Sequence, residues 1–215
     1  IASGCFNLRF ECLVIEEGGI KIMTDPGAWT TAQNEQKNIH IILITHEHQD
    51  HIHIDSLKTV LKNNPQAQII TNNGVAKILK KEKIAHTLLE HGGSKIFNNV
   101  LIEGYGKEHA DIYKTVPQVI NTGYCISNRF FYPGDSFYKP PKPVEILALP
   151  VAGPWMRIAD AIDYALALKP KYAFPVHDGM LKFFGSLHLL PQKILASQGI
   201  NFIIPEEGKK LLFKK

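Results

Sequence analysis

The chain has 215 residues, of which 45% are hydrophobic and 20% are charged, and its formal net charge is +4. This length and apolar content suffice for a sizeable core, so we expect a single domain over residues 1–215. No apolar run reaches the ~20 residues that a membrane-spanning helix needs, the N-terminal segment lacks a secretory leader pattern, and the mild charge identifies no partner. We therefore expect a cytoplasmic protein with no membrane partner.

The first half of the chain opens with strands and then alternates strands with helices. The predicted elements are strands at 6–15, 20–24, 39–45 and 68–71 and helices at 55–63 and 74–81, with Gly18-Gly19 as the turn of a hairpin between the first two strands. This exchange of short apolar strands and amphipathic helices indicates a layered α/β protein.

The second half is richer in strands. We predict strands at 94–105, 145–151 and 171–176, a hairpin of 118–127 and 129–132 around Ser127-Asn128, a helix at 158–168, and a lysine-flanked edge strand at the C-terminus. Asp135 and His177 each follow the end of a strand. Cys5, Cys12 and Cys125 are odd in number and widely spaced, which favours buried free thiols and a reducing compartment.

The most informative stretch lies directly behind the strand at 39–45 and reads Thr45-His46-Glu47-His48-Gln49-Asp50-His51. Residues two apart in an extended segment point the same way, so His46 and His48 can reach one cation. Asp50 and His51 follow where the chain turns, and they can face a second cation. Imidazole and carboxylate suit zinc, manganese or iron, whereas calcium and magnesium prefer oxygen ligands. We expect two divalent transition-metal ions, with zinc first. The alternative is a solvated histidine-rich turn.

This stretch resembles the His-x-His-x-Asp-His signature of the metallo-β-lactamase-fold hydrolases. Further landmarks of that superfamily recur in order, namely the segment ending Asp25-Pro26-Gly27, then His109, Gly134-Asp135-Ser136 and Pro175-Val176-His177. The pattern is most similar to the compact subgroup of L-ascorbate-6-phosphate lactonase and related uncharacterised hydrolases. The resemblance implies an α/β fold of four layers, an αββα sandwich of two mixed β-sheets with helices outside. All metal ligands would lie at one rim.

The resemblance also implies a ligand set. One ion would be held by His46, His48 and His109, the other by Asp50, His51 and His177, and Asp135 would bridge the two. His86 and His91 are rivals of His109, because they also lie between the signature and Asp135. Asp25 is either a carboxylate that fixes an imidazole tautomer or only a turn residue.

A binuclear site of this kind would supply a hydroxide bridged between two ions, with His46, His48, Asp50 and His51 as the catalytic residues. The first hypothesis is hydrolysis of an ester-like bond in a small anionic molecule, such as a lactone or a phosphorylated compound. The alternatives are a ribonuclease or phosphodiesterase with RNA as partner, β-lactam hydrolysis as a side activity, and a metal-dependent ligand-binding protein without catalysis. The oligomeric state does not follow from the sequence.

Several residues near these motifs are candidates for substrate contact. They are His53, Tyr105, Lys107, Trp155, Arg157, Asp178 and Met180. For each one, ordinary packing or surface is the more frequent role. Phe10-Glu11-Cys12 departs from the His-Ser-Cys or His-Ser that many compact relatives carry.

Overall fold

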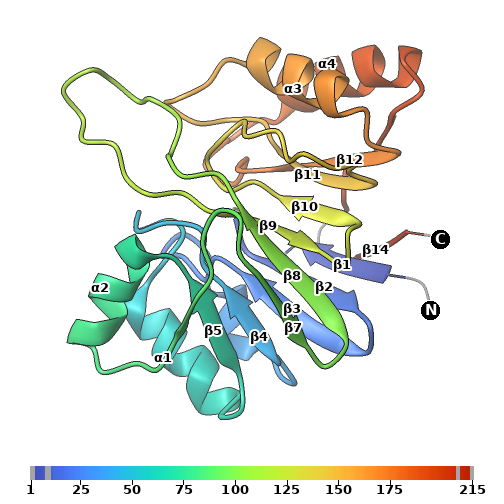
Figure 1. The fold of residues 1–215 in the computed structure, drawn as a ribbon. Helices are drawn as coiled ribbons and strands as arrows, with labels where there is room; N and C mark the ends of the chain where they lie inside the picture. The colour runs from blue at the N-terminus through green and yellow to red at the C-terminus, as the bar shows by residue number, and fades with distance from the viewer. Residues whose placement is uncertain (1–2, 8–10, 207–208, 214–215) are drawn as a thin grey trace.

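The computed structural model describes residues 3–7, 11–206 and 209–213, and in them two sheets pack face to face (Figure 1). The first is a seven-stranded sheet, in the order β14-β1-β2-β3-β4-β5-β6. Its strands are β1 (Ser3–Asn7), β2 (Leu13–Glu17), β3 (Ile20–Thr24), β4 (Ile41–Leu43), β5 (Gln68–Thr71), β6 (Thr87–Leu88) and β14 (Lys210–Phe213). Strands β1, β2 and β3 pair antiparallel, and β3 to β6 pair parallel, so the sheet is mixed.

The second sheet is also seven-stranded and mixed, in the order β13-β12-β11-β10-β9-β8-β7. Its strands are β7 (Ser94–Phe97), β8 (Val100–Tyr105), β9 (Gly123–Ile126), β10 (Phe130–Tyr132), β11 (Ile146–Pro150), β12 (Tyr172–Val176) and β13 (Asn201–Phe202). Helices α1 (Ile54–Asn63) and α2 (Asn73–Lys81) cover the first sheet, and α3 (Ile158–Leu168) and α4 (Gly185–Ser197) cover the second. A short 3-10 helix, η1 (Ala32–Glu35), precedes β4. The αββα sandwich is confirmed.

Three apolar layers hold the sandwich together, and strand periodicity assigns residues to them. Alternate side chains of a strand face opposite sides, so Leu43 packs between the sheets while its neighbours Ile42 and Ile44 pack under the helices. Tyr124 and Phe174 are fully buried in the layer between the sheets. The helices predicted at 55–63, 74–81 and 158–168 are confirmed to within a residue. No helix in the described ranges could cross a membrane.

Turn chemistry explains one correct and one incorrect strand prediction. The hairpin around Ser127-Asn128 is confirmed, and both residues have a φ of 54°, as a tight two-residue turn requires. The single strand predicted at 94–105 is wrong, because Asn98 and Asn99 have φ values of 47° and 67° and turn the chain into the β7-β8 hairpin. Asparagine tolerates this left-handed backbone better than most residues.

The chain ends were predicted less well. The strand predicted at 6–15 is two antiparallel strands, β1 and β2, and residues 8–10 lie outside the described part. The predicted C-terminal edge strand is confirmed as β14, which pairs with β1. Helix α4 was not predicted, because Pro191 stands inside it and Leu189 and Leu190 face solvent, which obscures the apolar stripe. Cys5, Cys12 and Cys125 are buried and free, as expected.

Candidate metal centre

The candidate residues come from strand ends that meet at one rim of the sandwich. Asp25 follows β3, residues 46–51 follow β4, Asp135 follows β10 and His177 follows β12. His109 lies on the long segment between β8 and β9, where its backbone N–H donates to Val119 O. Buried apolar strands therefore deliver polar side chains where the regular backbone pairing stops.

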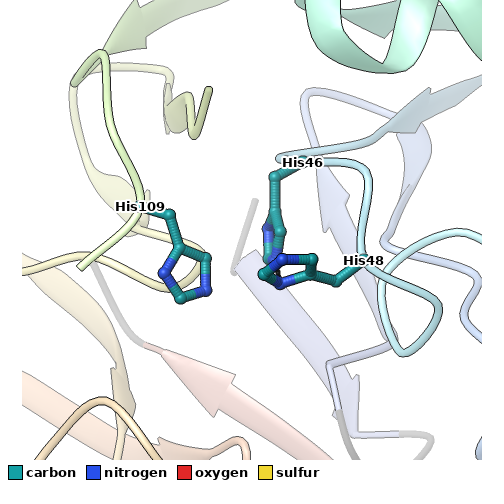
Figure 2. Close-up of side chains that lie close together, drawn as sticks. All are labelled: His46, His48 and His109. Carbon is teal, nitrogen blue, oxygen red and sulfur yellow. Dashed lines mark hydrogen bonds between the residues drawn. The ribbon is translucent and has the colours of Figure 1, made fainter. Parts of the chain in front are cut away.

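His46, His48 and His109 form the first of two ligand groups, and their rings converge (Figure 2). The ring centroids are 4.7 Å apart for His46 and His48, 4.8 Å for His48 and His109, and 4.9 Å for His46 and His109. Burial lowers the pKa of His46 well below its usual value, and it also lowers the pKa of His48. The neutral imidazole that results is the form that binds a metal.

Glu11, His51, Asp135 and His177 form the second group, and one ligand atom from each lies within 4.8 Å of the others. All four side chains are buried. Asp50 lies beside this group, with its Oδ2 3.7 Å from His51 Nε2 and 3.6 Å from His177 Nε2. The three expected ligands are therefore close together, and Glu11 joins them.

Asp135 lies between the two groups. Its Oδ2 is 3.2 Å from His109 Nε2 and 3.0 Å from His177 Nε2, and its Oδ1 is 3.2 Å from His51 Nε2. His46 Nε2 is 3.9 Å from Oδ2. One carboxylate thus faces imidazoles of both groups, which is the position that a bridging ligand needs.

The second group also contains buried polar atoms without hydrogen-bond partners, which a cation could satisfy. Among the described residues, Glu11 Oε1, His51 Nε2, Asp135 Oδ1 and His177 Nδ1 are buried without a hydrogen-bond partner. Burial of an unsatisfied polar atom costs about 1–3 kcal/mol, and more if it is charged. Two of these atoms, His51 Nε2 and Asp135 Oδ1, face the space between the ligand groups and lack the partner that a cation would supply. Imidazole nitrogen and carboxylate oxygen make a transition metal a suitable one.

Asp25 is more than a turn residue. Its Oδ1 accepts from the backbone N–H of Thr45, and its Oδ2 accepts from the Thr45 hydroxyl, each at 2.7 Å. The His51 Nδ1 also lies 2.7 Å from Asp25 Oδ2. A proton on Nδ1 leaves the Nε2 lone pair facing Asp135, so Asp25 sets the tautomer that His51 needs as a ligand.

The electrostatics of the second group reflect these close carboxylates. Burial alone would lower the pKa of His51, but Asp135 and Asp25 raise it well above its usual value. Burial likewise opposes the charge on His177, but Glu11 and Asp135 raise its pKa to about 9. Burial raises the pKa of Glu11 to about 8. A cation must therefore displace protons to bind here, and its affinity should fall as the pH is lowered.

Gly27 packs the Asp25-Pro26-Gly27 turn against the loop that carries Asp50 and His51. A Cβ at Gly27 would lie 1.7 Å from the backbone oxygen of Asp50. We expect Gly27→Ala to push the backbone of Asp50 and His51 away, lowering both zinc content and the thermal midpoint. The control is Gly92→Ala, where the backbone is strained but nothing lies within 4 Å of the added Cβ. Zinc analysis and thermal unfolding of both variants check this, and equal zinc content in the two would contradict it.

Trp155 contacts residues of both groups, and Lys107 lines a groove that includes His109. The Trp155 ring centroid is 5.8 Å from that of His109 and 5.9 Å from that of His177. Lys107 lines an open groove of about 590 Å³ next to His109, together with Ser136 and Phe137. An apolar wall and a cationic side chain thus flank the candidate metal centre.

The other candidates have structural partners. His53 Nδ1 lies 3.0 Å from Ser56 Oγ at the start of α1, and Arg157 pairs with Asp160 at the start of α3. Tyr105 donates to Glu103, Asp178 lies 2.7 Å from His188 Nε2, and Met180 is on the surface.

Glu11 was missed as a site residue. The available signal was an acidic residue placed directly before the apolar run Cys12-Leu13-Val14-Ile15.

The structure separates His109 from its two rivals. His86 Nδ1 lies 2.9 Å from Ile84 O, and His91 Nδ1 accepts from the Gly106 N–H, so neither joins a ligand group. We expect His109→Ala to lower zinc content and activity together. Its zinc affinity should fall by tenfold or more. His86→Ala and His91→Ala should leave both nearly unchanged. Zinc analysis decides it, and a greater loss in His91→Ala would show that the third ligand is misassigned.

Comparison with known proteins identifies the family of the chain. The model of the β-lactamase superfamily domain matches residues 8–177. Protein Rv0786c of Mycobacterium tuberculosis is 32% identical over 176 residues, which cover 79% of this chain and 81% of that protein. The UPF0173 metal-dependent hydrolase TV0864 of Thermoplasma volcanium is 24% identical, with coverage of 88% and 90%. The metallo-β-lactamase fold protein YhfI of Bacillus subtilis superimposes with a TM-score of 0.76 at 11% identity, with coverage of 99% and 100%.

The chain therefore belongs to the metallo-β-lactamase superfamily, whose members among its relatives include proteins named metal-dependent hydrolases. The predicted superfamily and fold are confirmed, and the similarity to the compact lactonase subgroup stays a prediction.

Proposed function

We propose that this protein is a binuclear metal-dependent hydrolase that acts on an ester-like bond of a small anionic molecule, with lactones and phosphorylated compounds as the favoured class. The observation that carries the proposal is Asp135, whose carboxylate faces imidazoles of both ligand groups. The named hydrolase among the relatives supports the reaction type. Three free thiols suit a reducing compartment, so we propose that the enzyme acts in the cytoplasm.

His46, His48 and His109 would hold one ion, and Asp50, His51 and His177 the other, with Asp135 shared. Two such ions, zinc being our first choice, would supply hydroxide at neutral pH by lowering the pKa of bound water to about 7. Asp50 is the least buried of the carboxylates at the centre, with a side-chain exposure of 13%. It is therefore suited to accept a proton from the attacking water or to orient it.

The two ions would favour a small substrate with a negative group, although Glu108 and Asp111 line the groove beside His109 together with Lys107. Lys107 in the groove beside His109 can pair with a phosphate or carboxylate. Trp155 contacts the rings of both His109 and His177, so it provides an apolar wall that limits water near the reacting bond. Lys107 would thus bind the negative group of the substrate, and Trp155 would shield the reacting bond from water. The histidines and aspartates would hold the ions.

A hydrolysis panel tests this proposal. Zinc-loaded protein is assayed with lactones, phosphate monoesters and diesters, RNA and β-lactams, alongside His109→Ala purified in the same way. We expect turnover of a lactone or a small phosphorylated ester that is lost in the variant. Exclusive turnover of RNA, or no turnover of any ester with zinc bound, would contradict the proposed substrate class.

A further inference from the structure

Each imidazole of the second ligand group has a buried carboxylate beside its Nδ1, namely Asp25 for His51 and Glu11 for His177, and Glu11 is itself a member of that group. Asp25 Oδ2 is 2.7 Å from His51 Nδ1, and this contact fixes the tautomer of His51. Glu11 has the same relation to His177, because its Oε1 is 3.7 Å from His177 Nδ1. The first distance is a hydrogen bond, and the second is about 0.5–1 Å too long for one.

The His177 ring has only one nitrogen that faces the centre. Its Nε2 lies 3.0 Å from Asp135 Oδ2 and 3.6 Å from Asp50 Oδ2, so Nε2 is on the ligand side. When Nε2 binds a cation, the proton of the neutral ring must sit on Nδ1. Both Nδ1 and Glu11 Oε1 are buried without a hydrogen-bond partner. Each of these two atoms thus lacks a partner that the other could supply at a separation shorter than 3.7 Å.

Tyr132 lies between the two carboxylates and can donate its one proton to Asp25 Oδ2, to Glu11 O at 3.0 Å or to Glu11 Oε2. Its hydroxyl lies 2.7 Å from Asp25 Oδ2 and 3.2 Å from Glu11 Oε2, and it is fully buried between the sheets. The contact to Glu11 Oε2 leaves Oε1 directed at His177. The backbone of His177 also has a φ of 59°, a left-handed conformation that persists only where surrounding contacts hold the residue.

We propose that Glu11 is a positioning residue for His177. Its Oε1 accepts the Nδ1 proton of that imidazole when Nε2 binds a cation, and the Tyr132 hydroxyl holds the carboxylate in place. Glu11 and Asp25 thus orient the two histidine ligands of one ion through a shared phenol. The inference rests on the proposed binuclear site and adds two residues, Glu11 and Tyr132, that act behind its ligands.

The test compares zinc-loaded wild-type protein with Glu11→Gln and Tyr132→Phe. Glutamine keeps the shape of Glu11 and an acceptor oxygen but removes the charge. The matched control is Tyr124→Phe, which removes another buried phenol from the same layer, one that donates to Ile44 O at 3.2 Å. The measurements are the affinity for the second zinc by chelator competition and the ¹⁵N–¹H spectrum of the histidine side chains, with His177 assigned by substitution.

In wild-type protein we expect a His177 Nδ1 proton that exchanges slowly with water. Glu11→Gln should weaken the second zinc site by about 10- to 100-fold and speed the exchange of that proton. Tyr132→Phe should change both in the same direction but less, and Tyr124→Phe should change neither.

Three results would overturn the inference. In the first, Glu11→Gln and Tyr132→Phe keep both wild-type zinc affinity and slow exchange. In the second, Glu11→Gln loses the second zinc while the His177 proton is unchanged, which would make Glu11 a direct ligand. A wild-type protein that never binds a second zinc would overturn the binuclear proposal itself, and this result is distinct from the first two.

Discussion

Asp135→Asn is expected to reduce hydrolysis by about a thousandfold, which corresponds to a rise of about 4 kcal/mol in the reaction barrier. The side chain faces His109 and His177 through Oδ2 and His51 through Oδ1, so it is the group common to both ligand sets. Asparagine keeps the shape and one oxygen but removes the negative charge that holds two cations close together. Metal content should fall together with the rate.

The stability of metal-free Asp135→Asn should change much less. Asp135 is buried at 2% exposure, but its backbone N–H bond to Asn121 Oδ1 does not depend on the side chain. We expect a loss of about 1–2 kcal/mol at most. The measurement pairs the hydrolysis rate with the thermal midpoint after chelation of both proteins. Near-normal hydrolysis by the variant would show that Asp135 only forms a turn.

Asp25→Ala should have the largest effect on folding. The substitution removes the acceptor of the Thr45 N–H, the Thr45 hydroxyl and the His51 ring, all of which are buried, while the Tyr132 hydroxyl keeps Glu11 O as an acceptor at 3.0 Å. Each buried donor left without a partner costs about 1–3 kcal/mol, part of which water can recover by entering the space. We therefore expect a loss of about 3–5 kcal/mol in the free energy of unfolding.

Denaturant unfolding of metal-free protein measures this loss. The control is Asp55→Ala, which removes an exposed carboxylate from the first turn of α1 and should cost about 1 kcal/mol or less. Asp25→Asn, which keeps the shape, should fold better than Asp25→Ala but bind zinc poorly, since an amide can present a donor to His51 and favour the wrong tautomer. Wild-type stability of Asp25→Ala would show that the buried network contributes nothing to folding.

Local patterns predicted a layered α/β protein and polar residues at the strand ends, whereas the family resemblance implied the sandwich and the ligand set at its rim. The apolar run at 39–45 is followed at once by His46 and His48, and strand ends deliver Asp135 and His177 in the same way. A strand end can be recognised from the local sequence without knowing which strands lie beside it. The close approach of the seven expected ligands follows from the order of the strands in the sheets, which the family resemblance implied.

The part that could not be predicted depends on contacts between distant segments. Glu11 and Tyr132 are 121 residues apart, and their contact exists only because β2 and β10 face each other across the core. Likewise, the role of Asp25 depends on its distance to His51 rather than on the Asp-Pro-Gly turn alone. The β7-β8 hairpin was missed because Asn98-Asn99 breaks an apolar run without a glycine or proline.

Zinc stoichiometry is the most direct test of the central claim. Protein stripped with a chelator and reloaded with excess zinc, then freed of unbound metal, should retain two ions per chain by elemental analysis. His109→Ala and His177→Ala, one from each ligand group, should each retain about one. A wild-type stoichiometry that stays near zero at saturating zinc would contradict the whole account, and a value of one that both variants abolish would contradict a binuclear centre.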